Sequence, residues 1–433
     1  MFHSSSGLRR RAPAVIGLAL VALVASACGS TGTSGSKATS LTMLAIGTPQ
    51  YAKSYDQALA SFTAQTGITV DVQGTGVATF DDVSQRLTNS ITAGNTPDIA
   101  IVGNNDLERF AAAGVAQPLD SLMAADRQFV DSNFDEDVLE ADKVKGKQVA
   151  IPYLMSTTQL FYNKDAFAKA GLDPNKPPQT FSELKAAAQA LVQSKAVKTG
   201  VNYDSVGSSG NANFLVYLLS AGGSMMDPDK KTVTFNSSQA RDVLTFWRDM
   251  VSSGLADAGK VKDHIDAFTR GDQGMEIVGN GAVANIKDVA KFSVGKAPMP
   301  VPDGGSLTMP IFGASVIVVT KDPARQASAW KVIKALTGPE GSTVLFKNIG
   351  YTPVSKLATA GSQYLAPLLA ADPLSQVGPQ DRGKIVPWFQ FPGRNATEIN
   401  DNLGSQIVAI LRGDTSPADG LAKAADQAKG LLQ

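Results

Sequence analysis

The chain has 433 residues, and its 39 Lys plus Arg balance 39 Asp plus Glu, so no net charge draws it to nucleic acid or to an acidic surface. Hydrophobic residues make up 43% and charged residues 18%, as in ordinary globular proteins, and the length predicts two domains or lobes. One cysteine and two histidines exclude an internal disulfide and disfavour a zinc site or a serine-type catalytic triad.

The first 28 residues have the pattern of an export signal. Three arginines at 9–11 precede an unbroken small and apolar run over 12–25, and Cys28 follows two further small residues. This pattern predicts a secretory signal peptide over 1–27, and a cysteine at the junction predicts a lipoprotein with Cys28 as the lipidated residue. The alternatives are a plain secretory signal with an incidental cysteine, or a membrane span. The apolar run is shorter than the ~20 residues that a spanning helix needs.

Residues 28–40 are predicted to be the lipidated cysteine and a flexible tether. The segment GSTGTSGSKATS at 29–40 has no apolar period and is rich in Gly, Ser and Thr. We therefore expect the folded body to stay at the outer face of the cell membrane, held there by its lipid anchor.

Alternating strands and helices are predicted from residue 41 onward. Apolar spacing indicates strands at 41–46, 68–72 and 97–102, with helices at 55–65, 83–93 and 107–113 between and after them. This order predicts an α/β layer with a parallel sheet, and a further strand is expected at 148–152.

The rest of the chain continues the alternation. Thr180 is the expected N-cap of a helix to residue 194, with Glu183 as its capping-box partner. The remaining expected elements are a strand that ends at 161–165, strands at 274–278 and 312–319, a loop at 301–309, and helices at 166–170, 213–221, 237–253, 285–292, 325–336, 341–348, 399–411 and 417–432.

Catalytic motifs are scarce in this sequence. It has no Gly-x-Ser-x-Gly elbow and no phosphate loop that ends in Gly-Lys-Ser/Thr. The segment GNGAVA at 279–284 fits a loose dinucleotide pattern between a strand and a helix. Glycines at such a turn are more often required by backbone geometry, and we interpret the segment as structural or as a solute contact.

The segment IPYLMSTTQLFYNKDAFAKAGLDP at 151–174 resembles the signature segment of family 1 extracellular solute-binding proteins, which serve ABC importers of sugars and of glycerol 3-phosphate. Further matches follow in the family's order: PQTFSEL at 178–184, Gly274-Met275 with Asn280-Gly281, FGAS at 312–315 and GYTPV at 350–354. Together they span nearly all of the mature chain. The similarity is greatest to the glycerol-phosphate-binding branch.

The resemblance implies a two-lobed, periplasmic-binding-protein-like α/β fold of type II, with a mostly parallel sheet flanked by helices in each lobe and a cleft between the lobes. It implies a first lobe over 41–155 plus 313–362 and a second lobe over 156–312 plus 363–433. Crossing segments are expected near Met155, Ile311 and Leu365. Hinge closure would bury a polar solute in the cleft.

The resemblance also implies solute contacts. Ser156, Tyr351, Gly313 and Asn280 match ligand-contacting positions of the glycerol-phosphate-binding branch. A purely structural role, as a cap or as packing, stays open for each of them.

Two further candidate regions come from the residues themselves. Asn104 and Asp106 follow the strand over 99–102, where the first lobe should meet the cleft. Trp388 belongs to the aromatic segment VPWFQFP at 386–392 and could present a ring face to a sugar, or could instead anchor the core.

One departure from the glycerol-phosphate-binding branch concerns the arginine that holds phosphate there. Counting back from Gly413 and Pro417, Asn400 occupies that position, and Arg394 lies six residues earlier as a possible substitute. This departure favours a neutral sugar over a phosphate ester.

We therefore expect a solute-binding lipoprotein of an ABC importer, a monomer with no catalytic residue, cofactor or metal. It would capture a sugar or oligosaccharide and deliver it to the membrane permease subunits. The main alternative ligand is glycerol 3-phosphate or a glycerophosphodiester. The alternative classes are an envelope glycoside hydrolase, with Asp98, Asp106 and Glu108 as candidate carboxylates, and a structural or adhesive lipoprotein.

Overall fold

A computed structural model describes residues 39–432, apart from 205–206, 260, 281–285, 372–384 and 394. The predicted signal peptide, Cys28 and Arg394 lie outside the described residues. Within the described ranges, no helix combines the length and the apolar character needed to cross a membrane.

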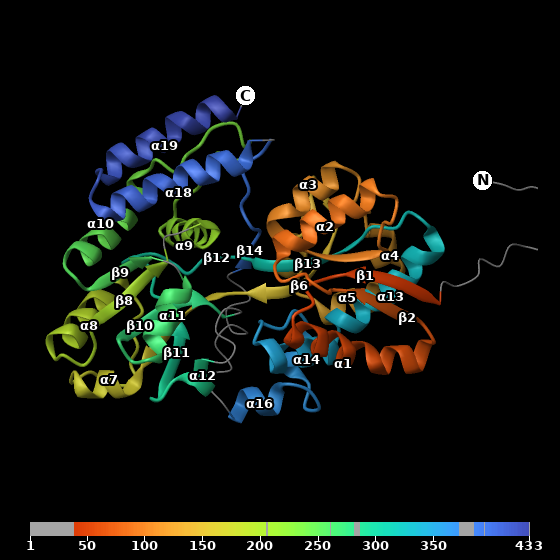
Figure 1. Ribbon diagram of the computed structural model, residues 1–433, viewed down its shortest axis with the longest axis horizontal. Coiled ribbons are helices and arrows are strands. Elements are labelled where there is room, and N and C mark those ends of the chain that lie inside the picture. The colour runs from red at the N-terminus through yellow and green to blue at the C-terminus, as the bar shows by residue number, and fades with distance from the viewer. Residues whose placement is uncertain are drawn as a thin grey trace, which may run out of the picture. The chain divides into compact units, whose positions relative to one another are not determined.

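The first lobe is built on a five-stranded sheet with the strand order β2-β1-β3-β13-β6 (Figure 1). Its strands are β1 (Ser40–Leu44), β2 (Thr69–Gln73), β3 (Ile99–Gly103), β6 (Ile151–Ser156) and β13 (Phe312–Val318). Strand β1 is parallel to β2 and β3, whereas β13 is antiparallel to β3 and β6. A late segment of the chain therefore returns into the middle of the first sheet.

Alternate side chains of the central strands belong to two different hydrophobic clusters, one on each face of the sheet. In β3, Ile99 and Ile101 belong to one cluster, and Ala100 and Val102 belong to the other, as expected for a strand buried on both faces. The elements around this sheet are α1 (Pro49–Thr66), α2 (Phe80–Thr92), α3 (Leu107–Ala112), α4 (Asp120–Ala125), α5 (Arg127–Asn133), α6 (Glu136–Glu140), β4 (Lys143–Val144), β5 (Lys147–Gln148), α13 (Pro323–Thr337), α14 (Pro339–Ile349), α15 (Lys356–Ala360) and α16 (Ala366–Ala371).

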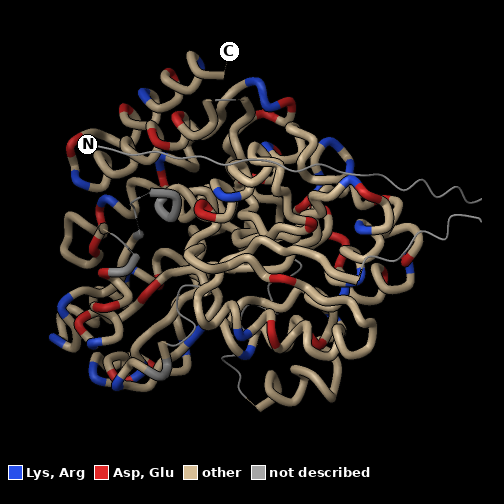
Figure 2. The backbone as a smooth tube through the Cα atoms, turned by 45° about the vertical axis from the view of Figure 1, so that its right-hand side comes forward, with Lys and Arg blue, Asp and Glu red and all other residues tan. Residues whose placement is uncertain are grey.

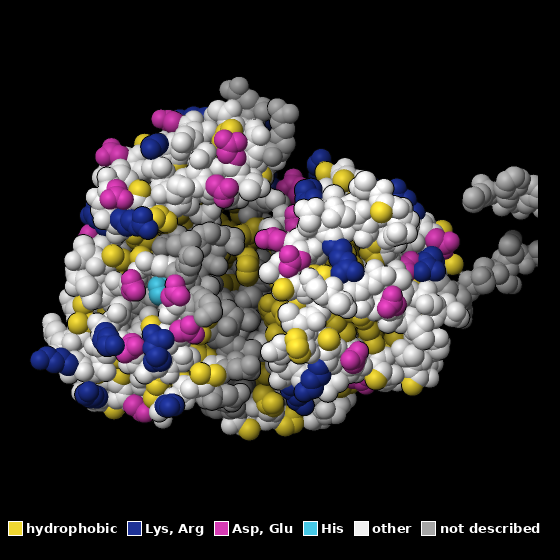
Figure 3. Space-filling model, in the orientation of Figure 1, with side chains coloured by type: hydrophobic (Ala, Val, Ile, Leu, Met, Phe, Trp, Pro, Cys, Tyr) yellow, Lys and Arg dark blue, Asp and Glu magenta, His cyan; other side chains and the backbone are white. Residues whose placement is uncertain are grey.

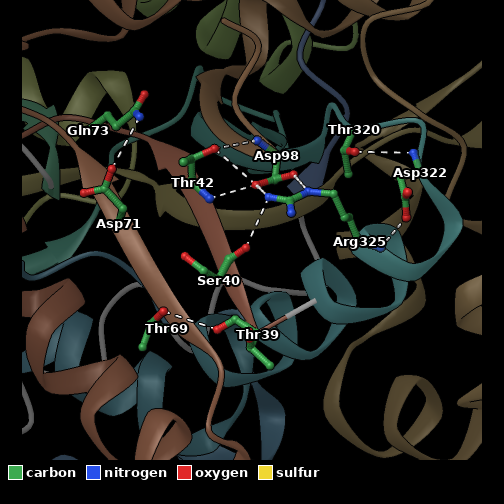
Figure 4. A network of polar contacts seen from close by, with 10 residues as sticks. All are labelled: Thr39, Ser40, Thr42, Thr69, Asp71, Gln73, Asp98, Thr320, Asp322 and Arg325. Carbon is green, nitrogen blue, oxygen red and sulfur yellow. Dashed lines mark hydrogen bonds and ion pairs between the residues drawn. The ribbon is translucent and has the colours of Figure 1, made fainter. Parts of the chain in front are cut away.

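An ion pair fastens the start of α13 to the first sheet (Figure 4). Both Arg325 Nε and Nη2 donate to the Asp98 carboxylate at 2.5 Å, and the Thr42 backbone N–H donates to the same carboxylate at 2.8 Å. Burial alone would raise the pKa of Asp98, but these hydrogen bonds outweigh it, so the pKa lies below its usual value. Asp98 is thus a charged structural residue that joins β1, β3 and α13.

The second lobe has its own five-stranded sheet, in the order β11-β7-β10-β8-β9. Its strands are β7 (Thr158–Asn163), β8 (Thr199–Asp204), β9 (Ala256–Gly259), β10 (Gln273–Gly279) and β11 (Val294–Pro298). Strand β7 is antiparallel to β10 and β11, whereas β8 is parallel to β9 and β10.

The largest hydrophobic cluster lies in the second lobe. Trp247, fully buried, packs in it against Tyr203 and Tyr217 with ring centroids 4.7 Å and 5.6 Å away. The helices of this lobe, with one short two-stranded sheet, are α7 (Lys164–Lys169), α8 (Phe181–Gln193), α9 (Gly207–Ser220), α10 (Ser238–Ser252), α11 (Val261–Thr269), α12 (Ile286–Val289), α18 (Ala396–Arg412), α19 (Pro417–Leu431), β12 (Met309–Pro310) and β14 (Ile385–Val386).

The two-lobed α/β fold is confirmed, and each sheet is mostly parallel. Four of the five strands in each sheet run in one direction, and a single strand, β13 in the first lobe and β7 in the second, is antiparallel to both of its neighbours. The predicted cap of α8 is confirmed, since the Thr180 hydroxyl accepts a hydrogen bond from the Glu183 backbone N–H. The Glu183 carboxylate accepts from Gln179 N instead of completing the capping box.

Charge is spread over both lobes. Figure 2 shows acidic and basic residues interspersed along the described backbone, in keeping with the balanced composition.

Candidate functional site

The chain passes from the first sheet to the second at Thr157, the single residue between β6 and β7. It returns at Phe312, which pairs with Ser156, and the preceding Ile311 donates its backbone N–H to Val386 O at 2.9 Å. Two crossing segments therefore lie side by side. On the face shown in Figure 3, a hollow lies between the two lobes, with hydrophobic side chains along its walls.

Asn280 joins three segments at this crossing. Its Oδ1 accepts from Thr157 N at 3.1 Å, and its Nδ2 donates to Gly350 O at 3.0 Å and to Thr352 Oγ1 at 3.1 Å. Asn280 is only 5% exposed, and both of its amide donors are already used within the protein. The end of β10 in the second lobe is thereby tied to the loop after α14 in the first. We refer to these hydrogen bonds of Asn280 as the crossing knot.

The crossing knot holds Gly350 and Thr352, the residues on either side of Tyr351. The Tyr351 hydroxyl accepts from the Tyr51 hydroxyl at 3.0 Å, and the two rings meet edge to face with centroids 6.5 Å apart. Burial raises the pKa of Tyr351, so its hydroxyl keeps its proton at neutral pH. Because Tyr51 donates to Tyr351, the Tyr351 proton is available for another acceptor.

Ser156 lies where strands of both sheets approach each other. Its side chain is buried, and it has no hydrogen-bond partner among the residues that the structure describes. A Cβ on Gly279 would lie 2.8 Å from Ser156 Oγ, so glycine at that position leaves the hydroxyl its space. Ser156 can therefore donate to, or accept from, a polar group that reaches the crossing.

Gly313 is required by the backbone. Its φ is +145°, and a Cβ there would lie 1.7 Å from Leu154 O. Gly313 pairs with Met155, and the register of β13 against β6 shifts just beyond it, between Ala314 and Ser315. Any solute contact at Gly313 would be made by its backbone alone.

An aromatic pair, Phe312 and Trp388, lies next to the crossing. Phe312 is 42% exposed, unusually high for a large hydrophobic residue in this fold, and its ring centroid lies 5.4 Å from that of Trp388. Trp388 is half-buried and packs against the main clusters of both lobes. Sequence reasoning predicted Trp388 and missed Phe312. The available signal was an aromatic residue directly before Gly313, at the start of a crossing strand.

The two first-lobe candidates are engaged inside their own lobe. Asn104 Nδ2 donates to Ser315 Oγ at 2.9 Å and to Asp142 Oδ1 at 3.2 Å, and Asn104 is buried. Burial raises the pKa of Asp142 to about 7, although the hydrogen bonds from Ser315 and Asn104 act in the opposite direction.

Asp106 is held by two partners near the same strand end. It accepts from Arg109 Nη2 at 2.8 Å and from the hydroxyl of Ser84. The structure therefore brings Ser156, Tyr351, Gly313, Asn280 and Trp388 together at the crossing, whereas Asn104 and Asp106 form separate bonded groups in the first lobe.

Comparisons with known proteins show which family this chain belongs to. The family model described as bacterial extracellular solute-binding protein matches residues 47–343, which is more than half of the chain. The chain belongs to the bacterial extracellular solute-binding proteins. The resemblance to family 1 solute-binding proteins of ABC importers is confirmed.

One sequence relative is the sn-glycerol-3-phosphate-binding periplasmic protein UgpB of Shigella dysenteriae serotype 1 (strain Sd197), which is 30% identical to this solute-binding protein over 289 residues, or 63% of this chain and 66% of the relative. Two solved structures share the fold. The cyclic alpha-maltosyl-1,6-maltose binding protein of Arthrobacter globiformis has a TM-score of 0.80 at 24% identity. The match covers 91% of this chain and 99% of the Arthrobacter chain.

The second solved structure is UgpB of Mycobacterium tuberculosis in complex with glycerophosphocholine. It has a TM-score of 0.78 at 21% identity and covers 92% of this chain and 98% of its own. The relatives named here are all binding proteins rather than enzymes, so this solute-binding protein is placed in the transport class by its family.

Proposed function

We propose that this solute-binding protein captures a neutral sugar or oligosaccharide between its lobes and delivers it to the permease of an ABC importer. The observation that carries the proposal is the exposed Phe312 ring, paired with Trp388, beside the crossing. An aromatic face suits the apolar side of a sugar ring, while nearby hydroxyls suit its polar edge.

Ser156 and Tyr351 supply those hydroxyls. Ser156 has no partner among the described residues, and Tyr351 accepts from Tyr51 and retains its own proton for donation. Neither group carries charge, which suits an uncharged polyol. Asn280 then acts indirectly, by holding the turn that carries Tyr351.

Glycerol 3-phosphate or a glycerophosphodiester is the second candidate. It is favoured by the similarity to UgpB proteins, one of which was solved with glycerophosphocholine. Phosphate recognition normally uses an arginine fork or lysines. The residues that gather at the described crossing are uncharged, and Arg394 lies outside the described residues.

A glycoside hydrolase is the least supported candidate. Two of its three candidate carboxylates are committed to structural partners: Asp98 to Arg325 and Thr42, and Asp106 to Arg109 and Ser84. Incubation with maltodextrins should therefore release no product.

The anchoring proposal concerns Cys28. We expect lipid attachment there, with residues 29–40 as the tether to the first lobe, which begins at residue 41. Metabolic labelling with a fatty acid should mark the wild-type chain, and Cys28→Ala should release an unlabelled, soluble form. Labelling that persists in Cys28→Ala would contradict the anchor.

A thermal-shift screen tests the ligand proposal. The mature chain is heated with maltodextrins, monosaccharides, polyols, sn-glycerol 3-phosphate and glycerophosphocholine. A ligand at 100 times its dissociation constant stabilises the folded state by about 2.7 kcal/mol. We expect stabilisation by a neutral sugar, reduced in Phe312→Ala. Stabilisation by the phosphodiester alone would replace this proposal with the second candidate.

A further inference from the structure

The turn over 227–232 is a preformed element of the second lobe. Asp227 Oδ1 accepts from Lys231 N at 2.7 Å and from Thr232 N at 3.0 Å, and Asp227 N donates to Thr232 O at 2.9 Å. The flanking residues Met226 and Val233 pair across the turn and belong to the main second-lobe cluster. Because Met226 and Val233 are buried in that cluster, the turn is anchored to the second lobe.

Lys230 sits at the tip of this turn in a left-handed conformation, with φ of +53°. Non-glycine residues adopt that conformation only when their surroundings hold them there. Here the Lys230 backbone N–H donates to Asp227 O at 2.9 Å. The hydrogen bonds from Thr232 N and Lys231 N lower the pKa of Asp227, which keeps it ionised as the acceptor that shapes the turn.

The tip of the turn meets the first lobe. Lys230 Nζ lies 4.0 Å from Glu108 Oε2, and the two side chains are 50% and 38% exposed. Glu108 lies on α3 between Leu107 and Phe110, which both belong to a first-lobe cluster. Of the ion pairs whose two members are both described, this is the one that joins the lobes.

We propose that Lys230 and Glu108 are positioning residues, an interlobe latch that favours approach of the lobes and so raises solute affinity without touching the solute. The apparent affinity for solute is proportional to the fraction of molecules whose lobes are in the binding-competent arrangement. An ion pair that favours approach of the lobes raises this fraction and so strengthens solute binding at the crossing. An exposed pair contributes little, and we expect about a two- to five-fold effect. Salt should remove it, because exposed charges are screened.

The inference has two parts, an effect of the latch on lobe separation and an effect on solute affinity. Only the effect on solute affinity rests on the proposed function. The effect on lobe separation exists without any solute and can be measured separately. The only cysteine of the chain is Cys28, so two introduced cysteines can be labelled in a Cys28→Ser chain. Ala60→Cys on α1 and Ala186→Cys on α8 place spin labels at exposed helical sites on the two lobes.

The first experiment records the distance distribution between the labels without solute. Glu108→Gln, Lys230→Gln and the double variant should each lengthen it by the same amount, since all three lose one interaction. The reversed pair Glu108→Lys with Lys230→Glu should restore the wild-type distribution at low salt. Lys231→Gln is the matched control, because Lys231 pairs with Asp229 inside the same turn. Unchanged distances, or an equal effect of the control, would overturn the latch.

The second experiment measures affinity for maltodextrin by calorimetry. Each neutral variant should bind about two- to five-fold more weakly than wild type at low salt and equally at 1 M salt. If distances respond and maltodextrin does not bind to any form, the sugar proposal fails and the effect on lobe separation stands. If maltodextrin binds all forms equally, the latch has no role in affinity and the inference fails, while the sugar proposal stands.

Discussion

Polar side chains have different roles in the crossing knot, where they are buried, and in the interlobe latch, where they are exposed. Asn280 is 5% exposed and makes three hydrogen bonds of 3.0–3.1 Å, whereas Lys230 is about half-exposed and lies 4.0 Å from its partner. Loss of a buried bond leaves its partners unsatisfied, while loss of an exposed pair returns both groups to water. The crossing therefore holds a fixed geometry, and the latch can only tune it.

The largest expected effect comes from Gly313→Ala at the crossing. The new Cβ would meet Leu154 O at 1.7 Å from a φ of +145°, and only backbone movement can relieve that contact. We expect a loss of about 4 kcal/mol in the free energy of unfolding, measured by denaturant titration.

The matched control for Gly313→Ala is Gly430→Ala in α19, where a Cβ has nothing within 4 Å. Alanine there should be neutral or stabilise by up to about 1 kcal/mol. Similar stability changes at both glycines would show that the crossing is not geometrically constrained.

Asn280→Ala tests the crossing knot itself. Thr157 N, Gly350 O and Thr352 Oγ1 would each lose a partner in a buried setting. We expect a loss of about 2–3 kcal/mol and weaker solute binding, because Tyr351 loses its support. Asn89→Ala, on an exposed face of α2, should change stability by less than about 0.5 kcal/mol. Equal melting temperatures for the two variants would contradict the role assigned to Asn280.

Asp142 is a buried group of the first lobe that can change its charge near neutral pH. With a folded pKa of about 7 against an ordinary 3.8, the folded chain holds a proton between these pH values that the unfolded chain has released. The free energy of unfolding should therefore fall as pH rises from 4 to 7 and level off above. Asp142→Asn should remove about 2 kcal/mol of this decline between pH 5 and 8.

The control for that pH series is Asp71→Asn, which alters an exposed carboxyl of the same lobe. Its pH profile should match that of the wild type. A wild-type profile that Asp142→Asn leaves unchanged would mean that the carboxyl is already ionised in the folded chain.

Phe312→Ala gives the smallest expected change in stability and a selective change in binding. Phe312 is 42% exposed, so truncation removes little buried area. Sugar affinity should fall about ten-fold through loss of the aromatic face, with the free energy of unfolding altered by less than about 1 kcal/mol. Leu357→Ala, at 39% exposure on α15, is the control and should leave binding intact.

Much of the fold could be predicted from the sequence because its long elements have clear periods and caps. The helix capped by Thr180 and the strand from residue 312 are examples. Strand β8 was missed because it carries a buried Asn202 and Gly200, which breaks the apolar alternation, and a Cβ on Gly200 would meet Ala188 at 2.6 Å.

The site was harder to predict because its bonds join residues that are distant in sequence. Asn104 follows a buried strand, as a cleft residue would, yet its partners Ser315 and Asp142 are 211 and 38 residues away. Asn280 likewise reaches Thr352 across 72 residues. The family motifs indicated the crossing. They do not distinguish a side chain that is hydrogen-bonded within the protein from one that is available to bind solute.

Small-angle X-ray scattering of the mature chain with and without saturating maltodextrin tests the central claim most directly, because capture between lobes requires the lobes to close. Maltodextrin should reduce the radius of gyration of the wild-type chain, and Phe312→Ala should require more sugar for the same reduction. A radius that stays constant under maltodextrin, while glycerophosphocholine reduces it, would contradict capture of a neutral sugar between the lobes.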